Sequence, residues 1–188
     1  MSSDGRGVVR LLFQNIENGD RRKFEAQSND AETGGGARDL RFRPEAEFLP
    51  FFGRMFPHKR MQSRRSKGVL TQIEVLSGEV KWIEGGHEKR ATMEVWPSTN
   101  ARPSECRIAR ISSFGLYDLI ADDPNGGRSV FMMFQQADGT IRMHFTTETS
   151  LRNDNWDPKI KKFTSDWIAE GSKSAYLDLA TKGQYPHV

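Results

Sequence analysis

The chain has a single cysteine, Cys106, among its 188 residues, so no internal disulfide can form. Its four histidines are scattered, and no group of cysteine and histidine has the spacing of a zinc site. We therefore expect no structural metal and no cofactor. No apolar run approaches the roughly 20 residues of a membrane span, and the opening MSSDGRG lacks the apolar centre of a signal peptide. These absences predict a cytoplasmic protein that does not enter a membrane.

A large excess of one charge is also missing, because 28 Lys and Arg residues face 25 Asp and Glu residues. The net charge of +3 argues only weakly for a polyanionic partner. The length suits one domain over residues 1–188, with residues 151–188 as a helical or irregular extension.

Basic residues concentrate in the stretch HKRMQSRRSK, residues 58–67, which has no acid and little apolar content. This composition predicts a mobile loop whose side chains, Arg64 and Arg65 among them, meet phosphates. A merely solvated loop explains the same pattern equally well.

Short strands dominate the remaining pattern. Residues 69–85, VLTQIEVLSGEVKWIEG, alternate apolar and polar side chains about Ser77-Gly78, which predicts a hairpin. Residues 129–136 and 140–147 flank Ala137-Asp138-Gly139, where Asp-Gly signals a turn. Further strands are expected in 7–16, 90–97, 105–112 and 117–122. Helices are expected only in 44–52 and within 165–183, where Ser165 would cap the start. We therefore predict a mainly β fold with a few short helices, a barrel or a sandwich.

Catalytic patterns are weak in this sequence. Glu79-Val80-Lys81 has the Glu-x-Lys form of some metal-dependent nucleases, and Asp118 is an acid that could join it. Alternating charges on the wet face of a hairpin explain the same tripeptide. The three glycines at 34–36 lack the lysine and hydroxyl order of a phosphate-binding loop. We therefore expect no catalytic residues and prefer a binding role.

Two stretches carry a resemblance to a known family. Residues 28–57, SNDAETGGGARDLRFRPEAEFLPFFGRMFP, resemble the Asn-Asp-x-x-x-Thr-Gly-Gly segment that opens the N-terminal effector-binding domain of the EcoRII restriction endonucleases. Residues 99–115, TNARPSECRIARISSFG, are similar to that family's Thr-Arg-Ser-Glu-Tyr-Arg-Leu-Thr-Arg segment. VFMMFQQADGTIRMHFTT resembles the hairpin that follows. The resemblance spans roughly residues 24–150 and implies a DNA-binding pseudobarrel related to plant B3 domains.

The resemblance implies that two loops enter the major groove of duplex DNA like a pair of arms. Arginine can donate two hydrogen bonds to guanine, and glutamate can accept one from cytosine. In the second arm Glu105 would read cytosine or orient one of the arginines, and Glu105 and Arg107 would share one side of a strand while Cys106 and Ile108 face the other. The three glycines would let the backbone of the first arm turn sharply and approach DNA. The expected DNA-binding residues are Arg38, Asp39, Arg41 and Arg43 in the first arm, Arg64 and Arg65 in the basic stretch, and Arg102, Ser104, Glu105, Arg107 and Arg110 in the second arm. A surface ladder of salt bridges is the alternative interpretation.

The sequence departs from the family pattern at several positions, which limits how many of the family's site residues can be assigned to this chain. Gly36-Ala37 stands where the family has His-Gln, so the first arm has lost a base-reading side chain or uses Arg38 instead. Pro103 is inserted in the second arm, Cys106 replaces a tyrosine, and the nuclease domain of the family is not expected here. We therefore predict a sequence-specific reader of double-stranded DNA of restriction-modification or defence type, with a separately encoded nuclease or methyltransferase as a candidate partner. The alternatives are a small metal-dependent nuclease and a protein-interaction module with a basic loop.

Overall fold

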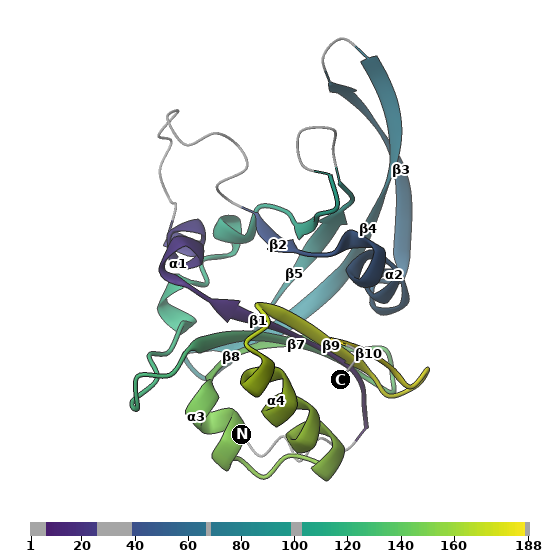
Figure 1. Ribbon diagram of the computed structural model, residues 1–188. Helices are drawn as coiled ribbons and strands as arrows, with labels where there is room; N and C mark the ends of the chain where they lie inside the picture. Colours follow the sequence, from purple (N-terminus) through teal and green to yellow (C-terminus); the bar gives the residue numbers. More distant parts are fainter. Residues whose placement is uncertain (1–6, 26–38, 67–68, 99–102, 187–188) are drawn as a thin grey trace.

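The structure is a computed structural model that describes residues 7–25, 39–66, 69–98 and 103–186. Figure 1 shows a strongly curled sheet that bends like half a barrel, with a long hairpin projecting from one end. The strands are β1 (Val8–Ile16), β2 (Leu40–Phe42), β3 (His58–Ser66), β4 (Val69–Glu84), β5 (His87–Trp96), β6 (Cys106–Ile108), β7 (Ser129–Gln136), β8 (Ile141–Thr147), β9 (Ser174–Asp178) and β10 (Gly183–Tyr185). The helices are α1 (Asn18–Glu25), α2 (Glu45–Met55), α3 (Glu148–Asn153) and α4 (Pro158–Glu170), with short 3-10 helices η1 (Ile111–Phe114) and η2 (Tyr117–Leu119). The expectation of a mainly β fold is confirmed.

One continuous sheet holds all of these strands, in the order β10-β9-β1-β7-β8-β4-β5-β6-β2, with β3 paired to β4. Neighbouring strands are antiparallel except β4 and β8, whose short parallel contact joins Val80 to Ile141 and Lys81 to Arg142. The strand β4 has 16 residues, and it pairs first with β3 and then with β5. It therefore belongs both to the projecting hairpin and to the curled sheet.

Both faces of β1 are buried, which explains its nearly continuous apolar sequence. Leu12 and Ile16 face the core inside the curl, together with the phenylalanines of α2. Leu11 and Phe13 face the other side, where α3 and α4 cover the sheet. The ring of Phe13 lies 5.4 Å from that of Trp167 in α4. Two apolar clusters thus hold the sheet between them.

The C-terminal segment 151–188 is not an appended helix or an irregular tail. Its strand β9 pairs with β1 along five residues, and β10 pairs with β9. The helix starts at Pro158 with Asp157 as its cap, whereas Ser165, the expected cap, lies inside it. The apolar residues around Tyr176 form a strand because β1 pairs with their backbone, while the two apolar clusters bury their opposite faces.

The prediction of a hairpin turn at Ser77-Gly78 is wrong, because β4 continues without a break through this dipeptide. A side chain at Gly78 would lie 3.0 Å from Phe56 and 3.2 Å from Pro57, so this glycine permits a close approach rather than a turn. The basic stretch is also not a loop. Residues 58–66 form β3, which gains its strand structure by pairing with the first half of β4.

Of the other predicted elements, one turn and one helix are confirmed and one strand is wrong. The turn at Ala137-Asp138-Gly139 joins β7 and β8 as predicted, and Gly139 has a φ of +86°. The helix expected over 44–52 is α2. The strand expected over 117–122 is wrong, since this region contains η2. No helix in the described part of the chain is long and apolar enough to cross a membrane.

Candidate nucleic-acid interface

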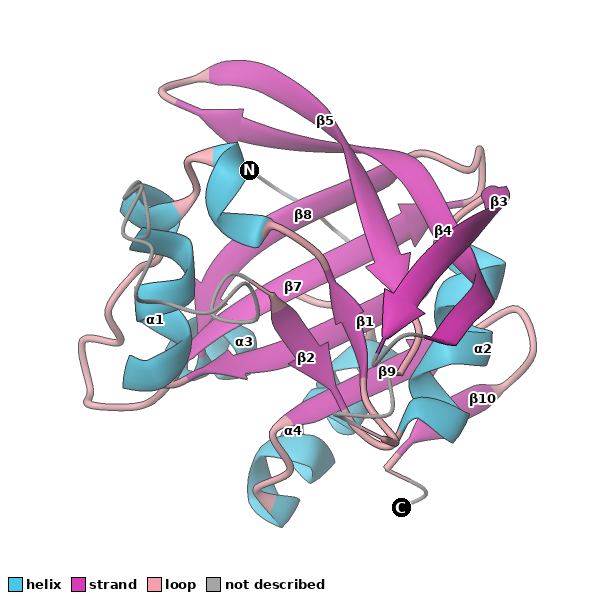
Figure 2. Ribbon diagram, turned by 90° about the horizontal axis from the view of Figure 1, so that it is seen from above, coloured by secondary structure: helices cyan, strands magenta, loops and turns pink. Residues whose placement is uncertain are grey.

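The described parts of the two segments expected to form the arms, residues 39–57 and 103–115, are joined by a pair of strands. Strand β2 of the first segment pairs antiparallel with β6 of the second, with Arg41 directly opposite Arg107. This pair of short strands closes the end of the sheet beside β5 (Figure 2). Because the pairing is antiparallel, Asp39 of the first segment lies beside Arg110, and Ser104 of the second lies beside Glu45 at the opposite end of the pair.

Strict alternation separates apolar from charged residues in these two strands. Leu40 and Phe42 of β2 and Cys106 and Ile108 of β6 are completely buried in the core. The opposite face carries the residues between them, which include Arg41 and Arg107. The sequence-based expectation that Cys106 and Ile108 point away from Glu105 and Arg107 is confirmed. Burial also raises the pKa of the Cys106 thiol, so it stays neutral.

Arg41 and Arg107 are like charges in directly opposite positions of neighbouring strands, and such pairs repel. Two buried carboxylates offset this repulsion. Asp39, only 5% exposed, lies 3.2 Å from Nε of Arg107. Glu105, also 5% exposed, pairs with Arg43 and lies 3.6 Å from Arg41. We call this cluster of Asp39, Arg41, Arg43, Glu105 and Arg107 the arm root.

Exposure differs sharply among the arginines of the arm root. The side chain of Arg107 is 16% exposed and that of Arg41 is also 16% exposed, whereas that of Arg43 is 68% exposed. The guanidinium of Arg107 also lies over the ring of Trp96, 5.8 Å from its centroid. Arg107 therefore packs as part of the framework, and Arg43 is the arginine that reaches solvent while a buried carboxylate holds it.

Residues at both ends of β6 adopt left-handed backbone conformations. Ser104 has a φ of 65° and Arg110 a φ of 55°, and both conformations are uncommon for residues with side chains. Hydrogen bonds hold them, since the carbonyl of Ser104 accepts from the amide of Glu45 and the amide of Arg110 donates to Asp39. The backbone is thus fixed where the second segment enters and leaves the sheet. Arg110 and Ser104 have exposed side chains.

A chain of polar contacts links the arm root to the projecting hairpin. Glu94 of β5 accepts hydrogen bonds from the indole of Trp96 at 3.0 Å and from Arg60 of β3 at 2.7 Å. Burial opposes ionisation of Glu94, but these hydrogen bonds prevail and lower the pKa of its carboxyl group. Trp96, Glu94 and Arg60 were not predicted from the sequence as site residues. Their contacts join β3, β5 and β6, and the local sequence pattern does not predict contacts between separate strands.

The hairpin of β3 and β4 projects beyond the body of the protein (Figure 1). The side chains of Lys59, Arg60 and Arg65 are exposed there, and Arg64 is partly exposed. Met61 and Leu70, each 62% exposed, also lie on this ribbon. The ribbon therefore presents a basic surface with two exposed apolar side chains.

Some expected site residues lie outside the described part of the chain. Arg38, Arg102 and the three glycines at 34–36 fall there. Of the others, the structure brings together Asp39, Arg41, Arg43, Glu105 and Arg107, with Ser104 and Arg110 at the ends of β6, whereas Arg64 and Arg65 stand apart on the hairpin.

Glu79 and Lys81, the β4 residues weighed for a nuclease, each form an ion pair with the neighbouring strand β5. Glu79 lies 3.8 Å from Arg90 on the neighbouring strand, and Lys81 lies 3.4 Å from Glu88. Asp118 belongs to η2. Within residues 7–25, 39–66, 69–98 and 103–186, no group of three or more histidine, cysteine or acidic side chains is placed to hold a metal ion.

Comparison of the chain with protein-family models, with curated proteins and with solved structures gave no match.

Proposed function

We propose that this chain binds double-stranded DNA in a sequence-dependent manner, through a B3-like pseudobarrel whose two arms enter the major groove. The single observation that carries the proposal is the pairing of β2 with β6. Two segments that resemble the DNA-contacting segments of one family, and that lie about 68 residues apart in sequence, are neighbours in space. A pair of arms requires this arrangement.

The chemistry of the arm root suits recognition of base edges by arginine. A guanidinium can donate two parallel hydrogen bonds to guanine, and its selectivity increases when its orientation is fixed in advance. Glu105 is buried and engaged with Arg43 and Arg41, so we assign it the orienting role rather than direct contact with cytosine. Arg43 is then the described residue best suited to reach a base.

The hairpin suits a different task. Its exposed Lys59, Arg60 and Arg65, together with the partly exposed Arg64, can neutralise phosphates without regard to sequence. The major groove also admits a two-stranded ribbon, so the hairpin has the width to follow DNA beside the arms. We therefore assign the basic hairpin to affinity and the arm root to specificity.

The test is selection of binding sites from a random duplex library in EDTA, followed by titration against the selected and a scrambled duplex. We expect one enriched motif and a preference of at least about tenfold for it. Enrichment of no motif would contradict sequence-dependent binding. The same duplexes are then incubated with Mg²⁺ or Mn²⁺. Cleavage that Glu79→Ala abolishes would instead identify the chain as a metal-dependent nuclease.

A further inference from the structure

A slot opens where β4 and β8 separate. These strands pair only at Val80–Ile141 and Lys81–Arg142, and beyond this point no strand among the described residues pairs with β8 on the side away from β7. A cavity of about 520 Å³ lies at this divergence. Its wall includes three consecutive residues of β4, from 81 to 83, and four consecutive residues of β8, from 142 to 145.

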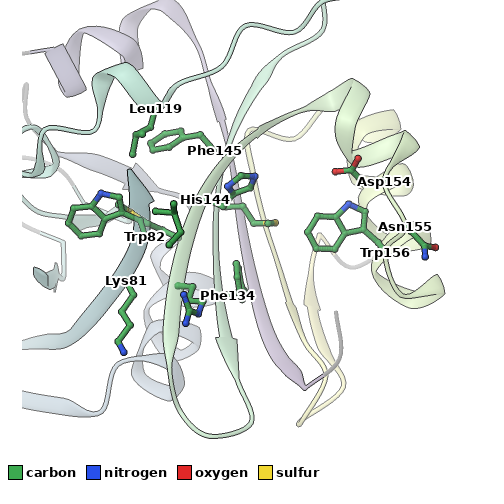
Figure 3. A pocket seen from close by; sticks show the side chains of 13 residues that line it. Lys81, Trp82, Leu119, Phe134, His144, Phe145, Asp154, Asn155 and Trp156 are labelled. Carbon is green, nitrogen blue, oxygen red and sulfur yellow. The ribbon is translucent and has the colours of Figure 1, made fainter. Parts of the chain in front are cut away.

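Consecutive residues of a strand point to opposite faces of the sheet, so this cavity runs along a strand edge rather than over one face. Trp82 and Phe145 belong to the core inside the curl, whereas Met132 and Trp156 belong to the cluster under α3 and α4. Figure 3 shows Trp82 and Leu119 on one side of β8, with Asp154 and Trp156 on the other. An occupant of the slot thus meets apolar walls on both faces of the sheet.

We propose that the slot binds an extended peptide segment of a partner protein, which adds a strand along the open edge of β8. An extended peptide meets both requirements of the site. Its backbone pairs with a strand edge, and its alternate side chains enter the apolar walls on opposite faces. A flat ligand lying on one face would contact only every second residue of β8. The lining part of β8 spans about 10 Å, which matches three or four residues of an extended chain.

Two further features define the chemistry of the peptide. The indole nitrogen of Trp156 is buried and has no hydrogen-bond partner among the described residues, so the slot offers one donor to an acceptor on the occupant. At the closed end, Lys81 and Arg142 share one carboxylate, Glu88, at 3.4 Å and 3.1 Å. Two cations whose shared partner, Glu88, is itself partly exposed favour an acidic residue or a terminal carboxylate at that end of the peptide.

The slot is separate from the arm root. It lies between β4 and β8 near α3, whereas β2 is the last strand of the sheet, beyond β5 and β6, and the hairpin projects away from α3 (Figure 1). Peptide binding here does not depend on the proposed DNA binding, so each can be tested while the other fails.

The experiment pans a phage-displayed library of random heptapeptides on the full chain, with His144→Trp as the blocked variant. His144 lines the cavity and has an exposed side chain, so a larger ring there fills the slot without entering the core. Lys161→Trp, an exposed change on α4, is the matched control. Thermal unfolding shows whether each variant is folded, and titration with duplex DNA gives an independent reading of the other function.

We expect enriched peptides with about three or four consecutive apolar residues, because both faces of the slot are apolar, and with an acidic residue near one end. After resynthesis, N-methylation of at least one set of alternate amides should weaken binding more than about tenfold, as should His144→Trp, whereas Lys161→Trp should not. Absence of enrichment relative to the blocked variant would overturn the proposal. Peptides that bind equally well after methylation of either set would also overturn it, because they would identify an apolar surface without strand pairing.

Discussion

The arm root and the projecting hairpin both carry clustered arginines, but they hold them in opposite ways. At the arm root two carboxylates are almost completely buried, and each fixes at least one arginine. On the hairpin the ion pair of Lys59 with Glu74 is about half exposed on both sides. A buried partner restricts the position of a guanidinium, whereas an exposed pair breaks and re-forms at little cost. In the proposed DNA binding, this difference assigns the arginines held by buried acids to specificity and the exposed basic side chains to phosphates.

The comparison predicts that burial of the acid decides the cost of its removal, and Asp178 is the extreme case. Its carboxylate is fully buried and lies 2.8 Å from Arg54 and 3.2 Å from Arg10. Asp178→Ala should lower the free energy of unfolding by about 3–5 kcal/mol, because two partly buried arginines lose their partner. Urea unfolding measures it. Asp166→Ala, in the exposed pair with Lys162, is the control and should change stability by less than about 0.5 kcal/mol.

The same carboxylate predicts the acid dependence of stability. Burial opposes ionisation of Asp178, but hydrogen bonds from Arg54 and Thr181 prevail and lower its pKa below the ordinary 3.8. Its contribution is therefore complete above the unfolded pKa and is lost as the pH falls through the lower folded pKa. Unfolding midpoints measured from pH 6 downward should decline less in Asp178→Asn than in the parent. Parallel declines would show that other groups cause the acid transition.

Glu105→Gln tests the arm root directly, with Glu74→Gln on the hairpin as its matched control. Loss of the buried charge leaves Arg41 without a full counter-ion, so stability should fall by about 1–3 kcal/mol. Glu74→Gln should cost less than about 0.5 kcal/mol. The selected DNA motif should also weaken in Glu105→Gln alone. A tighter binder with an unchanged motif would mean that Glu105 only balances charge.

The division of labour within the arm root can be sharpened with two arginine variants. Arg43→Ala should reduce the preference for the selected duplex by about 1–3 kcal/mol and lower stability less than Arg107→Ala does, because Arg41 still lies near the buried Glu105. Arg107→Ala should mainly destabilise the fold, since it packs against Trp96 and Asp39. Competition titrations and thermal unfolding separate the two effects. The reverse pattern would assign base contact to Arg107.

The smallest effect is expected on the hairpin. Arg64→Ala combined with Arg65→Ala should weaken binding to all duplexes alike and reduce the slope of log affinity against log salt by about one to two. The selected motif should survive. Lys161→Ala with Lys162→Ala on α4 provides the charge-matched control. An unchanged slope in anisotropy titrations would remove the hairpin from the interface.

Local sequence predicted those parts of the fold that local physics determines. Asp138-Gly139 gave the right turn because Gly139 needs a positive φ, and alternation correctly separated Cys106 from Glu105. The turn predicted at Gly78 is wrong, because a glycine needed for close packing cannot be distinguished in the sequence from one needed for a turn. The strand β3 escaped detection since its few apolar residues gain their conformation from β4.

The candidate site was predictable in composition but not in arrangement. The resemblance selected the charged residues of both segments, and the structure pairs the segments. Each acid pairs with an arginine of the other segment, Asp39 with Arg107 and Glu105 with Arg43. These pairs depend on the register between β2 and β6, which only the folded sheet defines. The slot beside β8 had no signal in the sequence, because it arises from the divergence of two strands.

The unbroken strand β4 makes the hairpin a lever. Val69 lies nine positions before Gly78 along β4, whereas Lys81, at the mouth of the slot, lies only three positions after it. At the rise of an extended strand these arms measure about 30 Å and about 10 Å. A rotation of about 10° at Gly78 would move the far end of the hairpin by about 5 Å and the mouth of the slot by less than about 2 Å. Phe56, Pro57 and Ile141 pack around Gly78, the point of rotation. The rigidity of this packing determines how far a displacement of the hairpin moves the slot.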